Sequence, residues 1–264
     1  MTNSSKITAG IDIGSTASKA VVLFDGEIAA YYIGPSTLNP SKTARLVFQE
    51  ALSNAGIDSR QVTYIVGTGY GRAKVEFAHE NVSEVSCHAR GAHYLLPAVR
   101  TVIDIGGQDT KAIGIDPSGN IRKFATNDKC AAGTGGFLDF MARSMGMKIR
   151  DMVLMHFEEG PPALISSMCS VFAESEVINL MNEEVPLPSI VKGLHKSVAN
   201  RLNTLARRVG VEKEIVVTGG VAKNTGVVEM LKHILGQEFV RFPDNVDPQM
   251  IGALGAAVIA SQKA

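Results

Sequence analysis

One motif occurs twice in this chain: an apolar run, typical of a buried strand, ends in Asp-Ile-Gly. The first copy has its aspartate at Asp12 and runs from Ile11 to Phe24, and the second has Asp104 and runs from Val102 to Ile113. Glycine lets backbone N–H groups approach an anion closely, and the hydroxyl and amide side chains that follow add donors for phosphate oxygens. A single such turn could be a simple hairpin. Two copies predict a duplicated pair of domains that bind a polyphosphate from both sides.

A third glycine turn strengthens the nucleotide interpretation. Ile215–Thr218 reads as a buried strand that ends in Gly219-Gly220, and a helix is expected to begin near Asn224. Bare backbone at a helix N-terminus suits the sugar or base of a ligand, although an ordinary strand-to-helix connection uses glycine in the same way. The chain has no phosphate-binding loop of the Gly-x-x-x-x-Gly-Lys-Ser/Thr type and no convincing dinucleotide fingerprint.

The bulk properties exclude several classes of protein. The 26 Lys and Arg residues balance the 26 Asp and Glu residues, so no net field favours nucleic acid or an anionic membrane. No stretch approaches the roughly 18 to 20 uninterrupted apolar residues of a membrane helix, and no secretory signal is recognisable. Three widely spaced cysteines do not make a disulfide framework. We therefore expect a cytoplasmic protein that binds neither nucleic acid nor membrane.

Hydrophobic periodicity and turn residues predict an α/β chain. The expected strands are 7–13, 18–24, 27–33, 64–67, 101–106, 110–116, 121–126 and 214–218. The expected helices are 41–55, 134–147, 171–182, 188–209, 224–235 and 248–262, the last rich in Gly and Ala and therefore packed closely on a neighbour. Residues 158–163 are expected to form a loop. No low-complexity linker separates the halves, which predicts two lobes joined by crossing helices.

These features resemble the ATPase fold that sugar kinases, actin and the heat-shock chaperones share. The resemblance implies a two-lobed, actin/sugar-kinase-like fold with duplicated domains and ATP in the cleft. Asp12–Lys19 would be phosphate loop 1, Asp104–Asp109 phosphate loop 2 and Thr218–Val221 the adenosine loop. We expect the first lobe to comprise 1–97 completed by 246–264, and the second to comprise 98–245.

The same resemblance assigns roles within these loops. Asp12 and Asp104 would organise Mg²⁺ and the attacking water, because carboxylates suit a hard cation that keeps several waters, and Gln108 is counted as catalytic with them. The expected ATP or ADP contacts are Gly14, Ser15, Thr16, Ala17, Ser18, Lys19, Gly106, Gly107, Gln108, Gly133, Gly135, Gly219, Gly220 and Val221.

Two of the three cysteines precede expected helices. Cys130 leads into Ala-Ala-Gly-Thr-Gly-Gly and an apolar helix, and Cys169 lies just before the helix expected at 171–182. A helix N-terminus stabilises a thiolate or an anionic cluster, although a lone cysteine is more often buried and inert. Two thiols are too few for a 4Fe–4S cluster, which takes four, whereas a twofold dimer would supply four. The residues alone do not decide between these alternatives.

Four motifs resemble one family closely: Thr68–Arg72, Ser86–Arg90, Asn127–Gly135 and Val171–Val177. They are similar to the activator components of 2-hydroxyacyl-CoA dehydratases, a family that includes the ATPase subunits of benzoyl-CoA reductases and the reductases of double-cubane iron–sulfur proteins. The resemblance spans nearly the whole chain. It implies a homodimer with one bridging 4Fe–4S cluster, for which Cys130 and Cys169 of both subunits are the metal ligands.

The resemblance also implies the reaction and its partners. ATP hydrolysis would drive one low-potential electron into an iron–sulfur dehydratase or a double-cubane cluster protein, with ferredoxin or flavodoxin as the electron donor. Gly136, where the family pattern often has Arg, and the loop Glu158–Pro162 depart from the pattern and bear on the identity of the partner. Cys87, next to His88, is expected to pack in the core. The alternatives are a small-molecule kinase of the same fold and, more weakly, an actin-like structural polymer.

Overall fold

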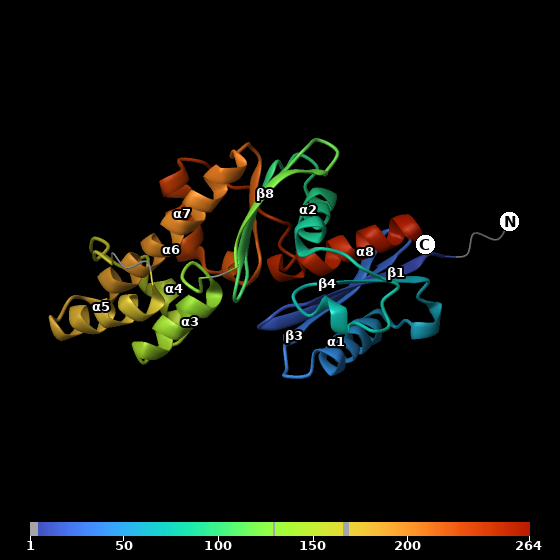
Figure 1. Cartoon of the computed structure of the whole chain (residues 1–264), viewed down its shortest axis with the longest axis horizontal. Coiled ribbons are helices and arrows are strands. Elements are labelled where there is room, and N and C mark those ends of the chain that lie inside the picture. The colour runs from blue at the N-terminus through green and yellow to red at the C-terminus, as the bar shows by residue number, and fades with distance from the viewer. Residues whose placement is uncertain (1–4, 129, 166–168) are drawn as a thin grey trace.

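The computed structural model describes residues 5–128, 130–165 and 169–264. Its strands form two sheets, with α2 (Glu84–Leu95) and α8 (Ile251–Lys263) in the middle of the molecule (Figure 1). None of the helices in these described segments is long and apolar enough to cross a membrane.

The first sheet has the strand order β3-β2-β1-β4-β5. Its strands are β1 (Ile7–Ile13), β2 (Ala17–Phe24), β3 (Glu27–Pro35), β4 (Tyr64–Thr68) and β5 (Glu80–Asn81). The hairpin between β2 and β3 turns at Asp25 and Gly26, both with positive φ, as expected for a two-residue turn. Helix α1 (Pro40–Ala55) buries an apolar face on this sheet, and the side chain of Asn39 caps it by accepting from the Lys42 N–H.

The second sheet has the order β8-β7-β6-β9. Its strands are β6 (Thr101–Ile105), β7 (Thr110–Ile115), β8 (Ile121–Asn127) and β9 (Ile215–Thr218). Asp12 lies opposite Lys19 on the antiparallel neighbour and opposite Thr68 on the parallel one. Asp104 lies opposite Lys111 and Thr218 in the same two relationships. The duplication seen in the sequence therefore extends to the strand register.

Five helices accompany the second sheet: α3 (Gly135–Ser144), α4 (Ile149–Met155), α5 (Ser170–Asn182), α6 (Leu187–Val209) and α7 (Thr225–Leu235). Helix α6 passes through the centre of their core. It buries an apolar stripe at helical spacing that includes Ile190, Leu194, Val198 and Leu202.

Helices α2 and α8 pack between the two sheets in a shared core. Helix α8 approaches α2 and β1 closely because the contacts are made at glycines, which have no side chain. A Cβ at Gly255 would lie 1.7 Å from the Cys87 carbonyl oxygen of α2, and one at Gly10 of β1 would lie 2.0 Å from the Ala253 oxygen. The expectation that the C-terminal helix packs closely on a neighbour is confirmed.

The expected strands and helices are present, with shifted ends and some additions. The single helix expected at 134–147 ends at Ser144, because Gly146 adopts a positive φ, and α4 follows as a separate helix. Helix α2 was not expected, because it buries small side chains such as Ala89 and Ala92, which give no periodicity of large apolar residues. The loop expected at 158–163 is present. The lobe boundaries after residues 97 and 245 stay predictions.

Candidate nucleotide site and cysteine segments

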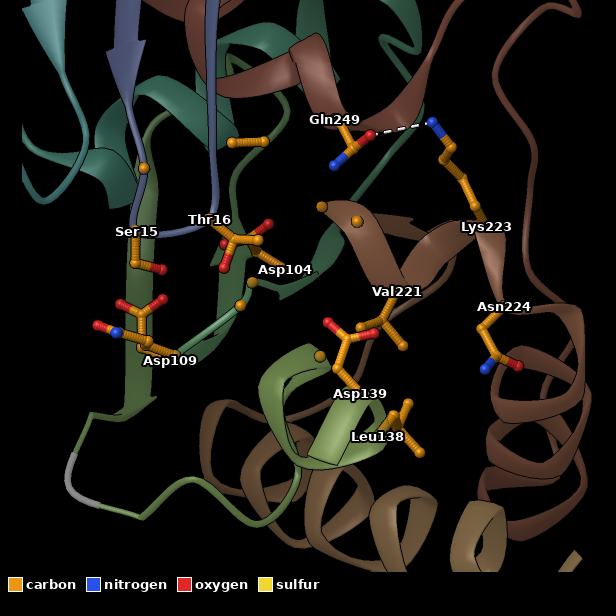
Figure 2. A pocket seen from close by; sticks show the side chains of 18 of the residues that line it. Ser15, Thr16, Asp104, Asp109, Leu138, Asp139, Val221, Lys223, Asn224 and Gln249 are labelled. Atoms are coloured by element: carbon orange, nitrogen blue, oxygen red, sulfur yellow. Dashed lines mark hydrogen bonds between the residues drawn. The ribbon is translucent and has the colours of Figure 1, made fainter. Parts of the chain in front are cut away.

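A cavity of about 720 Å³ lies where the two phosphate loops face each other (Figure 2). Both loops, the adenosine loop and helices α2, α3 and α4 contribute to its wall. The expected nucleotide contacts that line it are Gly14, Ser15, Thr16, Ala17, Lys19, Gly106, Gly107, Gln108, Gly135, Gly219, Gly220 and Val221, together with Asp12 and Asp104. Their contact with a nucleotide stays a prediction.

Two of the expected contacts lie outside this wall. Ser18 is buried between Ala17 and Lys19 on β2, and its hydroxyl hydrogen-bonds that of Ser36 at 2.8 Å. Alternate residues of a strand point to opposite faces, so Ser18 points away from the cavity that its neighbours line. Gly133 lies beside the aliphatic part of Arg201, where an added Cβ would be 3.3 Å from the Arg201 Cδ.

Phosphate loop 1 presents a buried ion pair to the cavity. The Asp12 side chain is only 6% exposed, and the Lys19 Nζ donates to its Oδ2 at 2.9 Å. The antiparallel register of β1 and β2 places the two residues opposite each other. A lysine at this position neutralises one carboxylate and leaves its second oxygen for another cation.

Phosphate loop 2 has the corresponding pair in a larger charge network. The Lys111 Nζ lies 3.5 Å from the Asp104 Oδ2, and 2.7 Å from both Asp109 and Glu84. Burial opposes the charge on Lys111, but Asp104, Glu84 and Asp109 outweigh it and raise the pKa of the ammonium. Burial likewise opposes ionisation of Asp104, but His88, Lys111 and a 2.9 Å hydrogen bond from Thr218 lower its pKa. Asp104 therefore remains a carboxylate at neutral pH.

The two phosphate loops are in contact, and glycine makes this possible. A Cβ at Gly107 would lie 2.2 Å from the Thr16 Oγ1, so a side chain there would push the loops apart. On its other side, phosphate loop 2 accepts hydrogen bonds from the start of α3: Gly135 N–H to Gly106 O at 2.9 Å, and Gly136 N–H to Gly107 O at 2.8 Å. Phosphate loop 2 is thus held between phosphate loop 1 and α3.

The opposite end of the cavity is more apolar. Leu138 and Asp139 of α3 lie beside Val221, and Asp139 directs its carboxylate into the cavity (Figure 2). Lys223 and Gln249 close another side, with a 2.9 Å hydrogen bond between them. Such a pocket can hold a flat apolar ring while polar groups at its edge fix the orientation of the ring.

Helix α2 contributes a residue that the sequence interpretation missed. His88 lines the cavity, is buried, and places its Nδ1 3.0 Å from the Thr218 Oγ1. Its neighbour Cys87 is fully buried, and burial raises the pKa of that thiol to about 12, with Asp12 and Glu84 adding to the effect. The packing role expected of Cys87 is confirmed. The only signal for His88 was its place in the Ser86–Arg90 motif.

The other two cysteines lie outside the cavity wall. Cys169 is exposed and is the N-cap residue of α5, whose first turn also exposes the side chains of Val171 and Phe172. Cys130 is half-buried five positions before Gly135, and its carbonyl accepts from the Asn127 side chain at 3.1 Å. Within residues 5–128, 130–165 and 169–264, no group of three or more metal-ligating side chains converges.

A cleft between two duplicated sheets, with a glycine-rich phosphate loop from each, defines an ATPase of the actin and sugar-kinase class. The sequence matches the BadF/BadG/BcrA/BcrD ATPase family over residues 9–260, and the chain belongs to that family. The activator of lactoyl-CoA dehydratase from Anaerotignum propionicum is 45% identical over 97% of this chain and 98% of that protein.

Solved structures agree with this assignment. The (R)-2-hydroxyglutaryl-CoA dehydratase component A of Acidaminococcus fermentans has a TM-score of 0.92 at 44% identity and covers 98% of both chains. The 2-hydroxyisocaproyl-CoA dehydratase activator of Clostridium difficile, solved with bound ADPNP, has a TM-score of 0.91 at 41% identity, over 97% of this chain and 95% of that one. A ROK hexokinase from Thermus thermophilus, 14% identical with a TM-score of 0.52, shares the fold alone. The fold implied by the sequence is confirmed, and the family favours an activating ATPase over a small-molecule kinase.

Proposed function

We propose that this chain is the reductive activator of an iron–sulfur 2-hydroxyacyl-CoA dehydratase or a related double-cubane cluster protein. It acts in the cytoplasm as a homodimer, takes electrons from ferredoxin or flavodoxin, and uses ATP hydrolysis to deliver one low-potential electron to its partner. The names of its relatives support a dehydratase-type partner, since two of them are activators of lactoyl-CoA and 2-hydroxyisocaproyl-CoA dehydratases.

One observation carries the coupling of the two chemistries. The N–H groups of Gly135 and Gly136 donate to the carbonyls of Gly106 and Gly107, so phosphate loop 2 is bonded directly to the segment that follows Cys130. A movement of this loop on nucleotide exchange must therefore displace the start of α3, or break these bonds. A kinase of the same fold has no need for this link to a cysteine.

The cavity suits ATP or ADP with Mg²⁺. The phosphates would lie between the two phosphate loops, and the purine at the apolar end beside Leu138 and Val221. Asp139 is placed to accept from ribose hydroxyls. The carboxylates of Asp12 and Asp104 fit a hard cation, because oxygen ligands and retained waters are what Mg²⁺ prefers. Gln108 would then orient the attacking water together with Asp104.

The cysteine segments suit a cluster shared between two copies. Cys169 is exposed at the N-terminus of α5, where unpaired N–H groups and the helix dipole favour an anion. With Cys130 it supplies two thiolates from each chain, and a twofold axis would bring four together. Such a cluster supplies storage of a single electron. The chain's own contribution is to hold the two thiols, one of them at the start of α5.

Helix α6 contacts both cysteine segments. It meets the segment that precedes Cys169 through the Lys192 Nζ, which donates to the Gly160 carbonyl at 2.8 Å, and through the Ser189 carbonyl, which accepts from Ala163 at 2.8 Å. Its Arg201 lies beside Gly133, close to Cys130. These contacts give both thiol segments a common support.

An anaerobic preparation tests the proposal. We expect a brown protein with about four irons per dimer, as one 4Fe–4S cluster requires. Cys130→Ser and Cys169→Ser should each abolish the iron–sulfur absorption while the protein stays folded by circular dichroism. Cys87→Ser is the matched control and should keep the cluster. A colourless wild-type protein that phosphorylates a small molecule would instead establish the kinase.

A further inference from the structure

We propose that His88 is a positioning residue for ATP hydrolysis, which holds Thr218 and, through it, the carboxylate of Asp104. The inference rests on the role proposed above for Asp104. It assigns to a helix outside both phosphate loops the task of fixing the direction in which that carboxylate points.

The three side chains form a short buried chain of hydrogen bonds. His88 is 5% exposed, and its Nδ1 lies 3.0 Å from the Thr218 Oγ1. The Thr218 hydroxyl donates to the Asp104 Oδ1 at 2.9 Å, and the His88 Nδ1 is itself 3.4 Å from the same oxygen. Thr218 ends β9 directly opposite Asp104 on β6, so the strand register supplies the middle member of the chain.

The number of available hydrogens decides which group donates in each of these hydrogen bonds. A threonine hydroxyl has one hydrogen, and here it points to the Asp104 carboxylate, which can only accept. The Thr218 oxygen must therefore accept from His88, which requires a hydrogen on the His88 Nδ1. A residue present only to fill space would not need to direct a donor at this atom.

The other edge of the His88 ring faces the first half-site. By half-site we mean one aspartate with its phosphate loop and the threonine opposite it: Asp12 with Thr68 in the first, and Asp104 with Thr218 in the second. A Cβ at Gly252 would lie 2.9 Å from the His88 Nε2 and 2.8 Å from the Asp12 Oδ2. The Nε2 edge of the ring and the Asp12 carboxylate therefore flank the same position of the α8 backbone, where Gly252 has no side chain. His88 stands where the two half-sites meet, on a helix that packs in the core shared by both sheets.

The first half-site lacks this support. Thr68 occupies the position opposite Asp12 that Thr218 occupies opposite Asp104. Its hydroxyl is buried, and it faces the Cys87 thiol, whose pKa it lowers, rather than a histidine. The two half-sites share their register, but within the described part of the chain a histidine reaches the threonine beside Asp104 and not the one beside Asp12.

Paired amide substitutions separate the two edges of the ring. The Nδ2 of asparagine can replace the His88 Nδ1, whereas the amide nitrogen of glutamine reaches toward the Nε2 position. We expect His88→Asn to keep most of kcat. His88→Gln and His88→Leu should lose about 10- to 100-fold, as is typical when a residue that orients a metal-binding carboxylate is removed. KM for ATP and the affinity for ADP should change little, because Asp104 rather than the binding surface is affected. Cys87→Ala, the adjacent fully buried residue, should match the wild type.

A double-mutant cycle with Thr218→Val completes the test. Because His88 acts through Thr218, the loss in the double variant should equal that of Thr218→Val alone rather than the product of the two single losses. Equal losses in the Asn and Gln variants, a rise in KM without a fall in kcat, or independent losses in the cycle would each overturn the positioning role. If Asp104→Asn keeps full turnover, the role proposed for Asp104 fails as well, so the two failures are distinguishable.

Discussion

His195 is a buried histidine whose titration should make folding strongly dependent on pH. It lies on α6 with no exposed surface, 3.0 Å from His156 (Nδ1 to Nδ1) and 3.4 Å from the Asn224 amide nitrogen (at its Nε2). The amide can only donate at Nε2, so the neutral ring keeps its hydrogen on Nδ1 and gives it to His156. Burial, and then His156, lower the pKa of His195 from 6.5 to about 3.

Proton linkage gives the direction and the size of the change in folding stability with pH. Between pH 6.5 and about 3 the unfolded chain binds a proton at His195 and the native protein does not, so stability falls as the pH falls. At pH 5, the protonation of the unfolded form with its ordinary pKa costs RT ln(1 + 10^1.5), or about 2 kcal/mol relative to pH 7.5. The pKa of His156 is also lowered, first by burial, and adds in the same direction.

Urea unfolding of the wild type and of His195→Asn at pH 7.5 and pH 5 measures this contribution. The asparagine keeps a donor toward His156 but does not titrate. Its stability should fall between the two pH values by about 2 kcal/mol less than that of the wild type. His233→Asn, at an exposed position of α7, is the control and should keep the wild-type dependence. Parallel curves for wild type and His195→Asn would refute the argument.

Three further perturbations test the site and the core. Asp104→Asn should still bind nucleotide but lose hydrolysis on the order of 100-fold, because it removes a preorganised charge rather than a binding surface; unchanged turnover would remove Asp104 from the mechanism. Gly255→Ala places a methyl 1.7 Å from the Cys87 oxygen and should lower the free energy of unfolding by about 1–3 kcal/mol in denaturation experiments. Gly114→Ala is the control and should change it little, because its Cβ would lie 3.5 Å from the nearest atom, on Arg122. Bathophenanthroline should chelate iron faster with a non-hydrolysable ATP analogue than with ADP, if nucleotides favour different lobe angles; equal rates and equal partner affinity would refute the coupling.

The sequence predicted those parts of the fold that depend on local pattern. A buried run that ends in Asp-Ile-Gly is a signature within a few residues, and both copies proved to be a strand end that faces the cavity. The strand pairs around them follow from alternation and turn residues. The cleft could be expected because two phosphate loops that bind one polyphosphate must face each other.

The missed features depend on contacts between distant segments. His88 lies 130 positions from Thr218, and no local pattern indicates that they meet. Leu138, Asp139 and α4 contribute to the cavity only because the connections between helices fold back over it. Ser18 lies in a motif whose other members line the cavity, but the alternation of β2 turns it away. Sequence motifs identify a segment, whereas the direction of each side chain depends on the element that carries it.

The two halves of the site diverge just where their strands end, and from this difference we expect one orientation of the nucleotide. Gly69 and Gly219 have nearly the same positive φ, near 90°, and a Cβ on either would lie close to the aspartate of its own half, Asp12 or Asp104. The next residue in the second half-site is Gly220, which leaves bare backbone toward the cavity. In the first half-site it is Tyr70, whose side chain is 82% exposed and lines the same cavity. On the Gly220 side the cavity wall is backbone, whereas on the other side Tyr70 adds an aromatic side chain to the wall. Although the two halves keep the same register, we therefore expect the base of the nucleotide to bind on the Gly220 side.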